Sequence, residues 1–455
     1  MNPKTDFLGT KSVHKLLFSL ALPAVIAMLA SGFYSVLSTL MICRGIDLLA
    51  VGAVGIVFPI QMLFHGFAQM ISIGAASDIS RSLGKKNFDR ANHTTTSSYF
   101  LTTVISVLLM FITATFSRFL LLTFGSNQEL LPLALDYLNV LIWSIPFNAI
   151  VLLSSAIFRA EGNLKQSMII VLIEAVINLL IEYILIFHFN LGIKSIAYAT
   201  LIAQALTSIY AISYILRKKS SVKFQLNYLK PTLEISKSIL SVGFSAFARN
   251  ASTATLALTV NVTLRTMAGT ASLTAFGAVN RIVNFFFLPI MGVNQGMQPI
   301  ASYNFGAKAF DRVQEVLKFS LIYTTAIGSI ATLIGILFPR ATIELFTNNP
   351  DILEEAIVIF RLQLLFFWTV GFQTITSTLY QALGQAIPAL IISTFKQLCF
   401  LIPLVYILPR FTNLQTFGVW VSYPIAEFLA FIVVLIALKK KWNFLKNHTN
   451  DSLLN

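Results

Sequence analysis

The chain has 455 residues, of which 56% are hydrophobic and only 11% are charged, and its formal net charge is +14. A soluble globular domain carries roughly a quarter charged residues. The composition therefore excludes an ordinary soluble protein and indicates an integral membrane protein. Most of the excess positive charge lies in short loops between apolar segments, which indicates membrane topology rather than a nucleic-acid partner.

Long apolar segments separated by short polar turns predict twelve transmembrane helices. Each segment reaches the ~20 residues that the hydrocarbon core of a bilayer requires of a helix. The segments are continuous in Leu, Ile, Val, Phe and Ala, whereas the strands of a barrel alternate, so an all-α membrane protein is expected. In chain order they lie near residues 14–43, 48–79, 92–120, 128–158, 165–188, 194–216, 233–264, 270–301, 311–338, 350–380, 386–408 and 416–438.

Lys and Arg are concentrated in every second loop. The basic loops precede the first apolar segment, follow the second, fourth, sixth and eighth segments, and end the chain. Because positive charge is retained on the cytoplasmic side of a membrane, both termini are expected in the cytoplasm. An even number of spans follows from that placement.

One short sequence occurs twice, 222 residues apart, which indicates duplication of a whole half-protein. The repeat predicts two pseudo-symmetric lobes: a six-helix lobe at 1–216, a cytoplasmic linker at 217–232, and a six-helix lobe with a short basic tail at 233–455. An even number of spans in each lobe gives both lobes the same orientation. The repeated residues are Ser80, Gly84, Phe88, Asp89 and Arg90, which recur as Ser302, Gly306, Phe310, Asp311 and Arg312.

The repeated turns have a structural interpretation that needs no substrate. Gly84 and Gly306 are suited to end a helix in the left-handed conformation. The aspartates that follow them lie where the next helix begins and favour its positive end. The alternative interpretation is that the turns form a contact that couples the two lobes.

The fifth span carries the most informative polar residues. Glu174, Asn178 and Glu182 are spaced four residues apart, which places them on one face of a helix. Carboxylates at bilayer depth are costly, so they face the protein interior or water and are candidates for a functional site. We predict that they bind the coupling ion, either H⁺ or Na⁺. The alternative is that each Glu hydrogen-bonds a neighbouring helix.

Other polar and ionisable residues within the spans are candidates for gating and for substrate binding. Arg249 and Arg281 are the candidates for gating, while Arg361, Lys396 and Glu427 are expected to snorkel or to pair across helices. A cavity lined by Phe, Met and amides suits bulky, flat cations. The candidates at a suitable depth are Gln61, Met62, His65, Met291, Gln295 and Met297, although a lone His such as His65 is often a packing residue.

Several chemical motifs are missing from the sequence. It has no Gly-rich phosphate loop, no His-Glu-x-x-His and no convincing nucleophile elbow, so neither an enzyme nor an ATP-driven pump is expected. Cys43 and Cys399 stand alone and lack the spacing of a metal site or a disulfide. No cofactor is expected, and no metal beyond Na⁺.

The eighth predicted span resembles a signature of the multidrug and toxic compound extrusion (MATE) family, most closely the bacterial branch with the MepA-type exporters. The resemblance extends over essentially the whole chain and includes residues 79–84, 380–384 and 418–427. The matching residues of the signature are Phe276, Gly277, Asn280, Arg281, Pro289, Ile290, Gly292, Asn294, Gln295, Gly296, Gln298, Pro299, Ile300, Tyr303, Asn304, Gly306, Ala307, Asp311 and Arg312.

This resemblance implies a V-shaped pair of six-helix lobes that exports organic cations by alternating access, as an antiporter driven by H⁺ or Na⁺. It also implies a role in antibiotic resistance and a place in the bacterial cytoplasmic (inner) membrane. The family has an Asn-x-x-x-Asp pair in the fifth helix, where this chain has Asn178 and Glu182. The family commonly has Asp in the first helix, where this chain has Ser38, which can ligate Na⁺ but cannot carry a proton.

Amphipathic cationic substrates and the lipid bilayer are therefore the expected partners, with a monomer as the expected assembly. Two alternatives stay open. Related duplicated folds flip lipids or lipid-linked metabolites, and a channel is a further possibility.

Overall fold

The computed structural model describes residues 5–217, 220–267, 269–344 and 350–454, and these residues form helices and no strands. The first half contains α1 (Phe7–Thr10), α2 (Val13–Gly45), α3 (Leu48–Gly84), α4 (Phe88–Thr123), α5 (Leu130–Leu141), the 3₁₀ turn η1 (Ile142–Ser144), α6 (Ile145–Ala160), α7 (Leu164–Phe187) and α8 (Lys194–Leu216). A short 3₁₀ turn, η2 (Leu226–Tyr228), lies in the linker between the halves.

The second half repeats this arrangement. It contains α9 (Leu233–Met267), α10 (Gly269–Gly306), α11 (Phe310–Leu337), α12 (Pro339–Glu344), α13 (Pro350–Leu364), the 3₁₀ turn η3 (Phe367–Thr369), α14 (Val370–Ala382), α15 (Ala386–Phe395), the π-helical turn η4 (Lys396–Leu401), α16 (Ile402–Phe411) and α17 (Gln415–Leu454).

Eleven helical segments within the described ranges are long and apolar enough to cross a membrane. The remaining predicted span, 233–264, is the seventh in the chain and corresponds to the 35-residue helix α9, which contains many Ser and Thr residues. The predicted span 128–158 is interrupted at η1, just before Pro146, because proline cannot donate the backbone hydrogen bond that a continuous helix needs. The expected short basic tail is helical through Leu454, as a continuation of α17.

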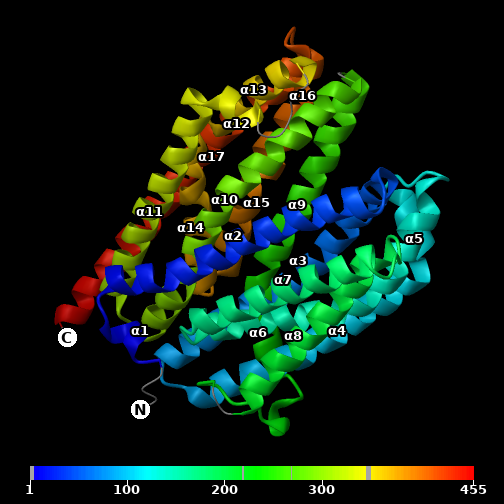
Figure 1. Cartoon of the computed structure of the whole chain (residues 1–455). Coiled ribbons are helices and arrows are strands. Elements are labelled where there is room, and N and C mark those ends of the chain that lie inside the picture. The colour runs from blue at the N-terminus through cyan, green and yellow to red at the C-terminus, as the bar shows by residue number, and fades with distance from the viewer. Residues whose placement is uncertain (1–4, 218–219, 268, 345–349, 455) are drawn as a thin grey trace.

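The two halves form two groups of helices that diverge from one end of the molecule (Figure 1). The first long helix of each half packs against a helix of the other half. In the first half this helix is α2, which lies against α10, and in the second half it is α9, which lies against α3. The halves meet closely at the end that carries α1 and the turns between α3 and α4 and between α10 and α11. The predicted all-α, V-shaped membrane fold is confirmed.

Gly84 and Gly306 have a different role from the one predicted. The left-handed residues of their turns are Lys86 (φ 58°) and Lys308 (φ 60°), whereas the glycines themselves are helical. A side-chain carbon at Gly84 would lie 2.0 Å from the carbonyl oxygen of Tyr303, and one at Gly306 would lie 2.2 Å from that of Arg81. The repeated glycines therefore let the backbones of α3 and α10 touch at the closed end.

The repeated arginines each hold the start of the other half. Arg312 donates hydrogen bonds to the carbonyl oxygens of Leu8 (3.2 Å) and Lys11 (2.7 Å), just before α2. Arg90 pairs with Glu234 in the first turn of α9, at 2.5 Å. These contacts favour the alternative interpretation of the turns, in which they couple the two lobes.

A buried carboxylate, Asp78 of α3, completes this closed end. It accepts hydrogen bonds from Thr94 (2.7 Å) and from Ser238 of α9 (2.9 Å), and it pairs with Arg81 (3.2 Å) and Arg90 (3.3 Å). The sequence reasoning did not single out Asp78, although an acid inside a span is the signal that would have identified it.

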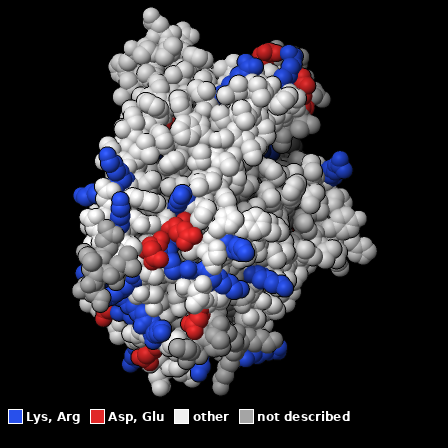
Figure 2. All heavy atoms as spheres, turned by 90° about the vertical axis from the view of Figure 1, so that its left-hand side faces the viewer, with Lys and Arg blue, Asp and Glu red and all other residues white. Residues whose placement is uncertain are grey.

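Charged side chains are unevenly distributed over the surface of the molecule. On the face that Figure 2 shows, most Lys and Arg side chains lie in the lower part, and a smaller charged group lies at the top. A band between these two groups shows few charged side chains. That arrangement is typical of a protein whose middle is surrounded by lipid.

Candidate functional site

The predicted polar face of α7 is buried against α2 and α8. Glu182 is 0% exposed and Asn178 is 2% exposed. The Ser38 hydroxyl of α2 donates a hydrogen bond to Glu182 Oε1 at 2.7 Å. The two helices also approach closely at Gly45 of α2, where an added side-chain carbon would lie 2.3 Å from Ile186 of α7.

Two buried oxygen atoms of this cluster accept no hydrogen bond. Oε2 of Glu182 and Oδ1 of Asn178 are both inaccessible and have no donor among the described residues. The Asn178 side chain is oriented by its amide nitrogen, which donates to Thr200 Oγ1 at 3.3 Å. Buried acceptors without a donor are costly, and a carboxylate, an amide oxygen and a hydroxyl are ligands suited to a hard cation. This set fits a bound Na⁺ or a proton on Glu182.

Glu174 belongs to a separate part of the same face. It lies two helical turns from Glu182, roughly 12 Å along the axis, and its carboxyl faces Gln204 of α8. Its side chain is only partly buried. The geometry therefore brings together Ser38, Asn178 and Glu182, and leaves Glu174 outside that cluster.

A cavity of about 320 Å³ lies beside the cluster in the first half. Its walls include three predicted substrate residues, Gln61, Met62 and His65. Thr200 also lines it, and the hydroxyl of this residue accepts the hydrogen bond from the Asn178 amide. The cavity and the polar cluster thus share a wall, which lets a bound molecule and a bound ion affect one another.

A second cavity of about 420 Å³ lies between the halves and within the second half. Met62 and His65 line it as well, so these two residues border both cavities. Met291 lines the second cavity, as does the candidate gating residue Arg249. Lys396 and Glu427 face the same space and pair at 2.9 Å, which agrees with the expectation of pairing across helices.

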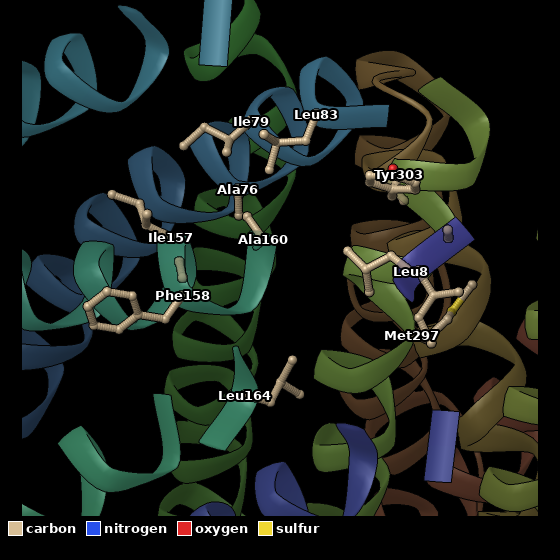
Figure 3. Close-up of a cluster of buried hydrophobic side chains, with 14 of the residues drawn as sticks. Leu8, Ala76, Ile79, Leu83, Ile157, Phe158, Ala160, Leu164, Met297 and Tyr303 are labelled. Carbon is tan, nitrogen blue, oxygen red and sulfur yellow. The ribbon is translucent and has the colours of Figure 1, made fainter. Parts of the chain in front are cut away.

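The remaining candidates lie elsewhere. Gln295 donates to the sulfur of Met28 at 3.4 Å, and Met297 is 0% exposed within the apolar core beside Leu8 (Figure 3). Neither lines the two cavities. Arg281 and Arg361 are exposed and also lie outside the cavities.

Sequence reasoning missed several polar residues that line the cavities. Thr200 and Gln204 of α8 lie four residues apart and line the first cavity, and Tyr137 receives a hydrogen bond from Gln61 at 3.2 Å. Gln69 lines the second cavity. The helical spacing of polar residues in an apolar span, which identified Glu174 and Glu182, would also have pointed to α8. No cluster of three or more His, Cys, Asp or Glu that could hold a metal occurs in the described part of the chain.

Comparison with known proteins decides the family. The MatE family model matches residues 23–184 and again residues 246–407, more than half of the chain. The chain belongs to the MatE family. The two matches are 223 residues apart (246 − 23), close to the 222-residue offset of the sequence repeat.

The curated relatives of this MatE protein include bacterial exporters. The multidrug export protein MepA of Staphylococcus haemolyticus (strain JCSC1435) is 27% identical over 427 residues, which cover 93% of each chain. MepA of Staphylococcus aureus (strain MSSA476) is 26% identical with the same coverage. This MatE protein is thus a multi-pass membrane protein of a family of secondary multidrug transporters, and not an enzyme.

Solved structures share the fold of this MatE protein. The crystal structure of MATE in the straight conformation superposes with a TM-score of 0.92 and is 23% identical, covering 97% of this chain and 99% of the other. An outward-facing MATE family transporter of the MOP superfamily gives a TM-score of 0.91 at 22% identity, covering 98% and 99%.

Proposed function

We propose that this MatE protein is a secondary multidrug exporter that exchanges organic cations and other xenobiotics for an inward-flowing cation, H⁺ or Na⁺. The observation that carries the proposal is the buried Ser38–Asn178–Glu182 cluster, with two open acceptor oxygens, beside a cavity. Export by the MepA relatives supports the choice of drugs as cargo.

The cavities suit amphipathic molecules. The first is lined by Phe58, Phe64 and Met62 together with polar groups of Gln61 and Asn148. Aromatic rings and a thioether attract flat, cationic compounds through cation-π and sulfur-aromatic contacts. The polar groups orient the bound molecule, while the apolar walls provide most of the binding energy.

Ion and substrate are coupled through the wall that they share. An ion on Glu182 and Asn178 fixes α7 against α2 and α8, and a drug in the cavity contacts Thr200 from the other side. If the two ligands favour opposite conformations of the lobes, each lowers the affinity for the other. Alternating access then follows from opening the end held by Gly84, Gly306 and Asp78, which is closed in this structure.

The same proposal places the protein in the bacterial cytoplasmic membrane as a monomer, with both termini in the cytoplasm. The clustering of Lys and Arg in the lower part of Figure 2, the part in which Figure 1 places α1 and both termini, supports this orientation.

Transport in inside-out vesicles tests the function. The purified protein is reconstituted into liposomes, in which the molecules inserted inside-out move dye inward. Na⁺ and pH gradients are imposed separately, and uptake of a panel of cationic dyes is recorded. We expect uptake with one of the gradients and none without either. Dye uptake at the same rate with and without the Na⁺ and pH gradients would contradict the proposal. Transfer of lipid between the leaflets without dye uptake would favour a flippase.

A further inference from the structure

The second cavity is lined by charged side chains, whereas no Asp, Glu, Lys or Arg is among the described residues that line the first. Within the described residues its charged side chains are Arg249, Lys396 and Glu427, and His65 is its other titratable group. By the 222-residue offset, Lys396 stands where the first half has Glu174 (174 + 222 = 396). The duplicated position has therefore exchanged an acid for a base.

Glu427 is already satisfied within this cavity. Lys396 binds its Oε2 at 2.9 Å, and the Thr369 hydroxyl donates to its Oε1 at 3.4 Å. Because this acid is paired with Lys396, its charge is compensated locally. Arg249 takes part in none of the ion pairs within 4.0 Å that the described residues form.

The guanidinium of Arg249 has few acceptors. Its one side-chain partner in the described structure is Gln69 Oε1, at 3.5 Å, which is the outer limit of a hydrogen bond. Asn250 donates to the same oxygen at 3.2 Å, so Arg249 shares this acceptor with a second donor. The amide of Gln69 is held in this orientation because its nitrogen contacts His65 Nε2 at 2.8 Å. A guanidinium has five N–H donors, so most of them are available to a ligand.

Further unsatisfied groups line the same space. Nε2 of Gln363 and Oε1 of Gln397 are buried and find no hydrogen-bond partner among the described residues, and both residues line the cavity. Lys396 and Gln397 begin the π-helical turn η4. Turns of this type are rare in proteins, and those that occur are often found at functional sites. The aromatic side chains of Phe287, Phe367 and Tyr423 form apolar parts of the wall.

We infer that the second cavity is a binding subsite for the anionic group of an amphipathic substrate, such as the carboxylate of an aromatic zwitterion, with Arg249 as its main ligand. A planar guanidinium binds a carboxylate through two parallel, charge-assisted hydrogen bonds. Arg249 is partly buried, and even partial burial of an unpaired cation is costly, so a ligand that supplies the missing negative charge gains from removing that cost. The inference rests on the proposed export function and specifies a substrate class for it.

A matched pair of dyes tests the inference. Rhodamine 110 carries a free carboxylate, and rhodamine 123 is its methyl ester, so the two differ in one negative charge. Their affinities for the purified full-length protein are measured by fluorescence polarisation at equilibrium, without any gradient. Arg249→Gln is expected to weaken binding of rhodamine 110 by about tenfold or more, from loss of a charged hydrogen bond, and to leave rhodamine 123 nearly unchanged.

Two further variants make the result specific. Arg249→Lys keeps the charge but loses the two-pronged geometry, so we expect an affinity for rhodamine 110 between those of the wild type and Arg249→Gln. Arg265→Gln removes the same charge from an exposed position on the same helix, outside the cavity, and is expected to bind both dyes like the wild type.

Three results would overturn the inference: no binding of rhodamine 110 by the wild type, an equal loss of both dyes in Arg249→Gln and Arg249→Lys, or no loss in either variant. Because the measurement uses no gradient, a failure of ion coupling at Glu182 leaves it unaffected. Conversely, gradient-driven transport of a purely cationic dye would persist even if this subsite were absent.

Discussion

Glu182→Gln is expected to reduce gradient-driven dye uptake to the level seen without a gradient. Glutamine keeps the size of the side chain and can still accept the hydrogen bond from Ser38, but it carries no charge and takes up no proton. The variant thus loses the ion while keeping the packing of α2 against α7. At ion concentrations too low to occupy the wild-type site, we expect its equilibrium affinity for a cationic dye to lie within about tenfold, or 1.4 kcal/mol, of the wild-type value.

A matched control is Glu354→Gln, which makes the same chemical change at a side chain that is 70% exposed and paired with Arg340 at 3.6 Å. Exposed ion pairs contribute little, so this variant is expected to transport like the wild type. Uptake by Glu182→Gln at the wild-type rate, with Na⁺ or pH gradients applied, would remove Glu182 from the mechanism.

The second large effect is expected at the glycine contact of the closed end. In Gly84→Ala, the new methyl group would meet the carbonyl oxygen of Tyr303 at 2.0 Å, a distance that only separation of α3 and α10 can relieve. Overpacking of this kind costs about 1–3 kcal/mol. Because the strain is confined to the closed state, the variant is expected to favour conformations in which this end is open.

Thiol labelling measures this shift. In a background in which Cys43 and Cys399 are replaced by Ser, Ser80→Cys places a thiol at a buried position whose hydroxyl contacts the carbonyl oxygen of Pro299. We expect faster labelling and a lower midpoint of thermal denaturation when Gly84→Ala is added.

The control for this experiment lies on the same helix. Apart from its own turn of α3, a side-chain carbon at Gly55 meets none of the described atoms within 4 Å, so Gly55→Ala is expected to label like the parent protein. Equal labelling of the Gly84→Ala and Gly55→Ala variants would show that the backbone contact does not hold this end closed.

Much of the fold could be predicted because a bilayer imposes simple rules. The apolar segments locate the helices, and the 222-residue repeat corresponds to the two halves that the structure shows. Helix ends were harder to predict. The last helix continues past residue 438 because nothing in its basic sequence breaks a helix once it leaves the membrane. The role of Gly84 was misassigned because a sequence does not distinguish a glycine needed for a turn from one needed for a close contact.

The charged residues of the candidate site could be predicted because burying a charge in a membrane costs free energy. The uncharged residues could not, because they carry no such cost. A carboxylate inside a span such as Glu182 stands out in the sequence. By contrast, Gln295 and Met297 were chosen by depth alone, and depth does not say which face of α10 lines a cavity. That rotation is set by packing against α2, which places Gln295 beside Met28 and Met297 in the core. Thr200 and Gln204 are uncharged and common in helices, so their role appears only once α7 and α8 are placed together.

The most direct test of coupled export is the linkage between ion and drug at Glu182. The equilibrium dissociation constant of a cationic dye is measured across a series of Na⁺ concentrations and, separately, across pH, for the wild type and for Glu182→Gln. Coupled sites typically differ by about 5–150-fold in affinity. We predict that one of these ions weakens dye binding to the wild type within that range, and that the dependence is absent in Glu182→Gln. The same dependence in both proteins, or none in the wild type, would contradict coupling through Glu182.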